Sequence, residues 1–245
     1  MKPYIVQTGK FPTRFCDPIR IAPVITAILL FFFGASSHQV GAHPTPFYQE
    51  KGFVYTADQR ANSISMIDLG TGLVRHAKLP VAPHNVQVSH DGRLLLIVGM
   101  PSGVEMSEGP SDMSMANQKE MPHGHLLILD SASMSTGRLV DIEVGKEPAH
   151  VIIDSLGMFV YVTNAGDNTV SVINVAHQKI VGTIETGKSP HGLRMSPNGR
   201  EIYVANNGSD TVSVIDVAGM REVARIKVGK APGQVGFTLS AAVVN

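Results

Sequence analysis

Short runs of four to seven mostly apolar residues, separated by polar turns, follow one another along the chain from about residue 52 onward. The runs YVTN, TVSVIN and KIVGTIE, between Tyr161 and Glu185, are rich in Val, Ile and Thr and predict β-strands. Between such runs stand NAGDN, SPNG and SHDG, whose Asn, Asp and Gly residues suit tight turns. No stretch after the first 42 residues keeps a helical period with caps, so we expect an all-β chain with little helix.

The strand pattern recurs at a fixed interval. Tyr161 and Tyr203 open two similar phrases 42 residues apart. A proline marks one point of each copy, and it occurs four times, as Pro83, Pro148, Pro190 and Pro232. The last three prolines are spaced by 42 residues, whereas the first gap is 65 residues, or one period plus an insertion of about 23. Four short strands in each period predict the four-stranded antiparallel blade of a β-propeller, so we expect about four blades.

The repeated residues resemble those of a known family. YVTN and YVAN, the strand VSVID or VSVIN, VG or TG before KxP, and SPNGR are similar to the repeat of YVTN-family β-propellers. That family includes YncE-like periplasmic proteins and is similar to the haem-d1 propeller of nitrite reductases. The resemblance covers about residues 52–238 and is closest in the last two copies. It implies the propeller fold but says little of function, because propellers carry many unrelated activities.

The number of copies leaves two arrangements open, because the resemblance implies a ring of about seven blades. In the first arrangement the chain is an open, truncated piece of a seven-blade propeller. In the second, four blades close into a ring, and Gln234–Thr238 completes the sheet begun by the first copy at residues 52–81. We favour the truncated arrangement, because blades shaped for a wide ring do not fit a narrow one.

A different kind of sequence precedes the repeats. Basic residues come before the apolar run IAPVITAILLFFFGA, and the small residues VGA stand before His43. This order predicts a secretory signal at residues 1–42, cleaved after Ala42, then a linker at 43–51 and a propeller domain at 52–245 with an insertion at about 98–124. An uncleaved membrane anchor is the alternative, but the run is shorter than the roughly 20 residues that a spanning helix needs. We expect a periplasmic or secreted protein with no membrane span after cleavage.

Charge and cysteine content narrow the choice of partners. The chain holds 20 basic and 20 acidic residues, and loss of residues 1–42 leaves 16 basic and 19 acidic. Nucleic-acid binding requires a concentrated basic surface, which this sequence lacks, so we expect no nucleic-acid partner. Cys16 is the one cysteine and lies in the predicted signal, so the mature chain has no disulfide.

Histidines recur beside the prolines, in segments that lead into the innermost strand of each predicted blade. His84 in APHN and His191 in SPHG are equivalent, His150 in EPAH stands one residue later, and Gly233 in APGQ interrupts the series. Such segments converge at the mouth of a propeller channel. Neutral imidazole is the commonest metal ligand in proteins, and the alternative is that each histidine caps a strand or bonds nearby backbone.

The insertion adds sulfur and further imidazoles on the same predicted face. Five methionines lie within 22 residues, namely Met100, Met106, Met113, Met115 and Met121. Thioethers favour Cu(I), and His123 and His125 add ligands that suit Cu(II), Zn or Fe. The candidate metal ligands are therefore His84, His150, His191, His123, His125, Met113, Met115 and Met121, with copper or another transition metal as the cofactor. Alternatively, the methionines have no core to fill and form a lid or a contact surface for another protein.

Three functions remain open, because the sequence lacks GxSxG, HExxH, P-loop and CxxCH motifs and offers no catalytic residue. The first, which we favour, is a secreted or periplasmic binding module with a protein or small ligand at the histidine-bearing face. The second is a metal- or haem-handling oxidoreductase-type propeller. The third is the remnant of a longer propeller.

Overall fold

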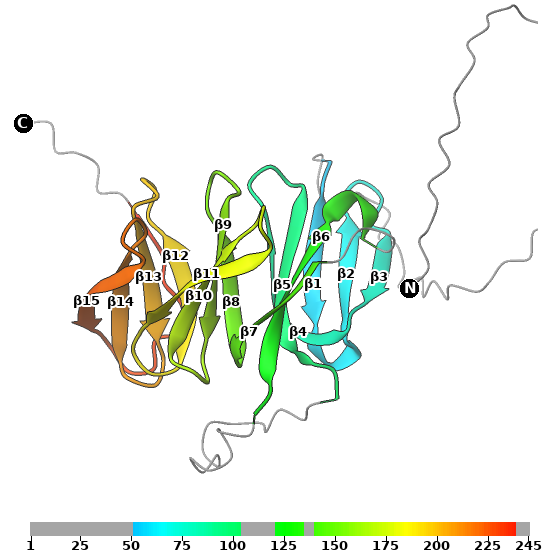
Figure 1. Ribbon diagram of the computed structural model, residues 1–245. Helices are drawn as coiled ribbons and strands as arrows, with labels where there is room; N and C mark the ends of the chain where they lie inside the picture. The colour runs from blue at the N-terminus through cyan, green and yellow to red at the C-terminus, as the bar shows by residue number, and fades with distance from the viewer. Residues whose placement is uncertain (1–50, 104–120, 135–139, 239–245) are drawn as a thin grey trace, which may run out of the picture. The chain divides into compact units, whose positions relative to one another are not determined.

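The computed structural model describes residues 51–103, 121–134 and 140–238, which consist of strands joined by turns (Figure 1). These residues belong to one compact unit, Gln39–Asn245, while the chain's other unit, Met1–His38, lies outside them. The only helices in the described ranges are two 3-10 turns, η1 (Gln59–Ala61) and η2 (Ser131–Ser133). Neither of these helices is long or apolar enough to cross a membrane. The prediction of an all-β chain with little helix is confirmed.

The strands form four antiparallel sheets, or blades, in chain order. Blade 1 holds β1 (Phe53–Asp58), β2 (Ser63–Asp68) and β3 (Val74–Lys78). Blade 2 holds β4 (Val81–Val88), β5 (Leu94–Pro101), β6 (His123–Asp130) and β7 (Val140–Lys146). Blade 3 holds β8 (Pro148–Ile153), β9 (Phe159–Asn164), β10 (Thr169–Asn174) and β11 (Lys179–Glu185). Blade 4 holds β12 (Pro190–Met195), β13 (Glu201–Asn206), β14 (Thr211–Asp216) and β15 (Arg221–Lys227).

The 42-residue repeat is visible in the details of blades 3 and 4. Their strand registers are equivalent, and each blade has a register shift directly after its proline, Pro148 or Pro190. A second shift follows Val172 in blade 3 and Val214 in blade 4. These two blades are the last two copies of the repeat, in which the family resemblance is closest, and both have their four strands.

The turns form where Asn, Asp and Gly recur. The side chains of Asp68, Asn174 and Asp216 accept hydrogen bonds from backbone N–H groups two or three residues later, at 2.8, 2.9 and 3.1 Å. Such side-chain bonds end a strand and start the turn that leads to the next one.

The core lies between successive blades. Leu95 and Leu96 of β5 point to opposite faces, so Leu95 packs with residues of blade 1 such as Ile64, while Leu96 packs with residues of blade 3 such as Val160. A third cluster joins blades 3 and 4 in the same way. The middle strands β5 and β9 are buried along nearly their whole length because another blade covers each of their faces.

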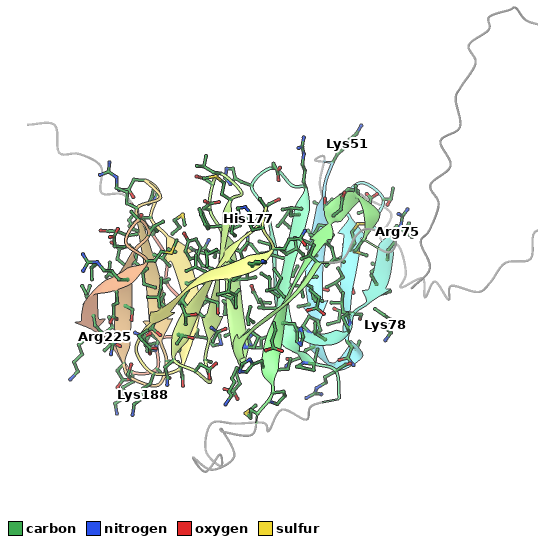
Figure 2. The ribbon with its side chains drawn as sticks, viewed as in Figure 1. Lys51, Arg75, Lys78, His177, Lys188 and Arg225 are labelled. Atoms are coloured by element: carbon green, nitrogen blue, oxygen red, sulfur yellow. The ribbon has the colours of Figure 1, made fainter. Side chains whose placement is uncertain are left out.

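Burial falls toward the outermost strands, which carry the charged side chains. Most residues of β3 and β15 are exposed, and Figure 2 labels Arg75 and Lys78 on β3 and Arg225 on β15. Figure 2 also labels His177, which stands in the exposed turn between β10 and β11.

The four blades form a partial propeller that is not closed. Blade 1 has three strands, and residues 228–238 form no strand, so the predicted completion of blade 1 by Gln234–Thr238 is not found. The polar groups of Gly233 and Gln234 instead bond to residues of β12 and β8. The predicted signal at residues 1–42 and nearly all of the linker lie outside the described residues, as do residues 104–120 of the insertion.

Candidate functional site

Three imidazole rings meet at one end of the innermost strands. His84 lies on β4, His150 on β8 and His191 on β12, and β8 contacts both β4 and β12. The ring centroids are 6.0 Å apart for His84 and His150, 5.7 Å for His84 and His191, and 4.7 Å for His150 and His191. The structure thus brings together the three histidines that the sequence places near one channel mouth. We call these three residues the histidine cluster.

Backbone carbonyl groups fix two of the rings. His84 Nδ1 lies 2.7 Å from the carbonyl oxygen of Ala149, and His191 Nδ1 lies 3.1 Å from that of Gly233. A carbonyl oxygen only accepts, so each Nδ1 carries the hydrogen and donates it. Ala149 and Gly233 directly follow the repeat prolines of the next copies, so each bond joins one copy to the following one. The alternative expectation, that the histidines bond nearby backbone, holds for these two.

Thr163 makes the corresponding link where no ring is available. Ala149 stands in blade 3 at the position that His84 and His191 hold in their blades. The hydroxyl of Thr163 on β9 donates to the carbonyl oxygen of His191 at 2.8 Å and accepts from the backbone N–H of His150 at 3.0 Å. The carbonyl oxygens of Ala149, His191 and Gly233 therefore each have a hydrogen-bond donor from the preceding blade.

The third ring is fixed by an amide. Nε2 of His150 lies 3.1 Å from Nε2 of Gln234. A carboxamide nitrogen only donates, so Nε2 of His150 is the acceptor and its neutral ring carries the hydrogen on Nδ1. When the rings are neutral, this arrangement places the hydrogen of all three on Nδ1 and leaves their Nε2 atoms as hydrogen-bond acceptors.

Burial keeps two of these rings neutral. It lowers the pKa of His150 to about 4, and the neighbouring His191 and His84 add to this effect. Burial also lowers the pKa of His191, although the Gly233 carbonyl partly opposes the change. Both rings are therefore uncharged at neutral pH, and the cluster offers lone pairs rather than positive charge.

The other predicted imidazole ligands lie elsewhere. Nδ1 of His125 lies 2.6 Å from Asp141 Oδ1, and Nδ1 of His123 lies 2.9 Å from Glu143 Oε1. Both carboxylates belong to β7, the outermost strand of blade 2, whereas His84 is on β4 on the far side of β5. The structure therefore does not bring His123 and His125 into the histidine cluster.

The methionines of the insertion divide into two groups. Met106, Met113 and Met115 lie outside the described residues, while Met121 is half-buried just before β6. Met100 belongs to β5, opposite Ala82, and is 3% exposed. The expectation that the five methionines have no core to fill is therefore wrong for Met100, because β5 continues to Pro101. Among the described residues, no group of three His, Cys, Asp or Glu side chains has the spacing of a metal site, and the metal assignment stays a prediction.

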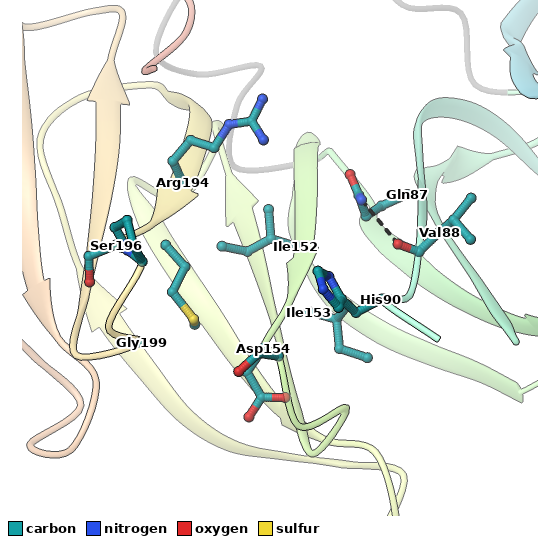
Figure 3. Close-up of a pocket in the computed structure, with 12 residues that line it drawn as sticks. Gln87, Val88, His90, Ile152, Ile153, Asp154, Arg194, Ser196 and Gly199 are labelled. Carbon is teal, nitrogen blue, oxygen red and sulfur yellow. Dashed lines mark hydrogen bonds between the residues drawn. The ribbon is translucent and has the colours of Figure 1, made fainter. Parts of the chain in front are cut away.

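A pocket of about 340 Å³ lies at the opposite end of the same strands (Figure 3). Gln87, Ile152 and Arg194 line it from β4, β8 and β12, and each stands four residues after its repeat proline. Sequence reasoning missed this pocket. The available signal was one repeat position that holds a different kind of side chain in every copy.

The pocket combines an apolar wall with a cation. Ile152, Ile153 and Met195 supply the apolar side chains, and Arg194 supplies the positive charge. Asp154 also lines the pocket, but its Oδ1 accepts hydrogen bonds from the backbone N–H groups of Met158 and Phe159. Within the part of the chain that the structure describes, the Arg194 guanidinium makes neither a hydrogen bond nor an ion pair. Such a lining suits a small ligand with an apolar body and an anionic group.

A comparison with known protein families finds a match for part of the second half of the chain. Residues 146–242 match the model of a family described as YNCE-like beta-propeller. Over these residues the chain is similar to YNCE-like β-propellers. The resemblance drawn from the repeats is thereby confirmed, and blades 3 and 4 of this YNCE-like segment carry two of the three clustered histidines. A search of curated proteins finds no match.

Solved structures support the fold. A protein from Desulfotomaculum acetoxidans DSM 771, described as functionally unknown, superposes with a TM-score of 0.56 at 11% identity over 77% of this chain and 59% of its own. Hydrazine synthase from Kuenenia stuttgartiensis superposes with a TM-score of 0.50 at 24% identity over 64% of this chain and 39% of its own. The chain thus spans about two fifths to three fifths of these proteins. At such identities the likeness shows the fold alone.

Proposed function

We propose that the chain is a binding module that works outside the cytoplasm and holds its ligand at the histidine cluster. The observation that carries this proposal is the meeting of three imidazoles from three blades, with centroids 4.7 to 6.0 Å apart. Blades 2, 3 and 4 each contribute one ring. A ligand at this point therefore contacts three rigid strands at once, which is the arrangement that gives a binding site its geometry.

The hydrogen-bond pattern defines the ligand chemistry. Because Nδ1 of His84 and of His191 donates to backbone, their Nε2 atoms are left as acceptors. The Nε2 of His150 already accepts from the carboxamide of Gln234, which supports a ligand with a group of the same type. We therefore propose a ligand that presents N–H donors, such as an amide or amine of a peptide or small molecule.

Nuclear magnetic resonance of protein whose histidines carry nitrogen-15 tests this proposal directly. Acetamide and methylammonium, as N–H donors, and acetate, as a pure acceptor, are titrated while the imidazole nitrogen resonances are recorded. We expect the two donors to shift the Nε2 resonances of the cluster and acetate to leave them in place. A variant with His84→Ala and His191→Ala should lose the response, whereas His177→Ala, in the exposed turn after β10, should keep it. Equal shifts with acetate, or none with the donors, would contradict the proposal.

Metal binding is the second candidate function, and the fixed rings favour it. Metal-binding histidines commonly donate their second N–H to a backbone carbonyl or a carboxylate, and His84 and His191 make this bond to carbonyl oxygens. A metal at the cluster requires the three Nε2 atoms to move toward one point, about 2.0 to 2.4 Å from each. In this proposal Met113, Met115 and Met121 are additional ligands for copper.

Titration with Cu(I), Cu(II) and Zn(II) tests the metal proposal. The unmodified protein is compared with the His84→Ala, His191→Ala variant and with a variant lacking residues 106–121. We expect the first variant to bind Cu(II) and Zn(II) at least about tenfold more weakly, because two imidazoles are lost. Equal, weak binding by all three proteins would exclude the cluster as a metal site.

The location outside the cytoplasm rests on the predicted signal at residues 1–42. Fractionation of cells that produce the protein, followed by amino-terminal sequencing, tests it. We expect a protein that begins at or near His43 outside the cytoplasm. An intact amino terminus in the cytosolic fraction would contradict this part of the proposal.

A further inference from the structure

One glycine–asparagine contact occurs both where blade 2 meets blade 3 and where blade 3 meets blade 4. The backbone N–H of Gly145, at the end of blade 2, donates to Oδ1 of Asn164 in blade 3 at 3.1 Å. A Cβ atom at Gly145 would lie 2.5 Å from Cγ of Asn164. At the next junction a Cβ atom at Gly187 would lie 2.5 Å from Nδ2 of Asn206. Both junctions therefore require a glycine on one blade and hold an amide of the next blade against it.

At the free face of blade 4, the residues equivalent to those of the two junctions have no neighbouring blade against them. Gly229 follows Gly187 by 42 residues, and a Cβ atom there would have nothing within 4 Å. Ile184 of β11 is 3% exposed because blade 4 covers it, whereas the equivalent Ile226 of β15 is 50% exposed. The free face of blade 4 thus repeats an established interface without its partner.

Blade 1 has the complementary free face. Val160 of β9 and Ile202 of β13 are fully buried at their junctions, whereas the equivalent Val54 of β1 is 43% exposed. Asp58 ends β1 as Asn164 ends β9, and its carboxylate accepts from the hydroxyl of Ser63 at 3.3 Å as Asn164 bonds to Thr169 and Ser171. Blade 1 therefore carries the apolar and polar groups that would meet Ile226 and Gly229.

The segment after β15 already follows the path of a further innermost strand. Ala231 N–H donates to Asp210 Oδ1 at 2.9 Å, as Ser189 N–H donates to Asn168 Oδ1 at 2.8 Å. The two residues also share a left-handed backbone, with φ of 46° and 47°. Within the described ranges no strand pairs with residues 232–238 or with the edge of β1 that faces away from β2. One extended segment without a pairing partner and one three-stranded sheet are thus both available.

We propose that a second copy of this chain covers these faces. Blade 1 of the second copy docks on blade 4 of the first, and residues 232–238 of the first copy pair with β1 of the second to complete a four-stranded blade. The register of blade 4, in which Met195 is opposite Ile202, places Phe237 opposite Val54 of the second copy. Asp58 of the second copy then accepts from Gly229. This interaction surface is independent of the ligand proposed for the histidine cluster.

Two such contacts close the assembly. Each copy offers one blade 1 and one blade 4, so two copies related by a two-fold axis satisfy both faces of both chains. The result is a ring of eight blades, which lies within the range of about four to eight that propellers adopt. Apolar surface on both free faces is then buried as it is at the three junctions within the chain.

Light scattering after size-exclusion chromatography tests the proposal with one matched pair of variants. We expect the full chain to have twice the mass of one chain and Gly229→Val to have the mass of one chain, because its side chain fills the place of Asp58. Gly229→Val has free space within its own chain, so its circular dichroism should stay unchanged. His177→Val, in an exposed turn, should keep the double mass. A full chain of single mass, or a Gly229→Val variant of double mass, would overturn the proposal.

A disulfide provides a second measurement. In a Cys16→Ser background, Val54→Cys and Phe237→Cys place the only two cysteines at exposed positions that the proposed register sets opposite each other. We expect oxidation to link two chains, seen as a band of doubled mass on a non-reducing gel. The pair Leu156→Cys and Phe237→Cys, with Leu156 in an exposed turn of blade 3, should give at least about tenfold less of that band. Bond formation within one chain would show that blade 1 meets the same copy and would overturn the proposal.

Discussion

The two ends of the innermost strands β4, β8 and β12 differ in whether the same residue type recurs from one repeat to the next. At one end histidines stand one or two residues after three of the four repeat prolines, and the rings of His84 and His191 bond to the backbone of the following copy. At the other end the equivalent residues are Gln87, Ile152 and Arg194, which share no chemistry and line a pocket. One end therefore combines fixed, similar groups, and the other combines groups that each occur once.

Packing between blades is also tighter at the histidine end than at the pocket end. At the histidine end Gly145 touches the buried side chain of Asn164, which hydrogen bonds to two hydroxyl groups hold in place. At the pocket end Gly199 has open space around it and is required only by its left-handed backbone, with φ of 70°. The histidine end is thus constrained by neighbouring blades, whereas the pocket end is constrained mainly by its own turn.

The largest effect is expected from one substitution made at both ends. Gly145→Ala places a methyl group 2.5 Å from Cγ of Asn164 and should lower the free energy of unfolding by about 3 kcal/mol, because the blades must separate. Gly199→Ala meets no atom and should cost about 1 kcal/mol through its left-handed backbone. Urea denaturation of the two variants measures the difference. Equal losses would remove the distinction in packing.

A smaller effect is expected from pH at the histidine end. The pKa of His150 is about 4 in the folded chain and about 6.5 in an unfolded one, so the unfolded state binds more protons between these values. Stability should therefore fall as pH drops from 6.5 to 4. Because the ring is partly exposed, we expect a His150 contribution of about 1 to 2 kcal/mol.

His150→Gln is the matched variant for this measurement, since it removes the titrating ring. Urea denaturation at several pH values should show a shallower loss of stability for His150→Gln than for the unmodified chain. An identical slope in both proteins would mean that protonation of His150 is not coupled to folding.

The smallest effect on stability is expected at Arg194. Its guanidinium has no partner among the described residues, so Arg194→Ala should change the free energy of unfolding by no more than about 0.5 kcal/mol. The same substitution should weaken any binding of small carboxylates to the pocket, measured by calorimetry with hexanoate. A loss of stability above about 2 kcal/mol would instead assign Arg194 a role in holding the strands together.

The fold followed from local chemistry. Val, Ile and Thr in short runs, with Asn, Asp and Gly between them, specify strands and turns through contacts a few residues apart. The 42-residue period then supplies the arrangement of the blades. The extent of β5 was missed because Met100 looks like the start of a polar insertion, although it continues the buried strand.

The site was predictable only in part. His84, His150 and His191 recur near the repeat prolines, and position within a repeat was enough to bring them together. The bond between His150 and Gln234 joins residues 84 positions apart and recurs nowhere else in the described ranges, so no sequence pattern indicates it. The pocket was missed for the same reason, because Arg194 has no counterpart of similar chemistry in blades 2 and 3.

The central claim is that the histidine cluster is a fixed set of hydrogen-bond acceptors. A long-range proton–nitrogen correlation spectrum of the histidine rings at pH 7.5 tests it most directly, because it reports which ring nitrogen carries the hydrogen. We predict that His84, His150 and His191 are each protonated at Nδ1 and bare at Nε2. Protonation at Nε2 in His84 and His191 would contradict the claim, since these rings would then present donors and not acceptors to a ligand.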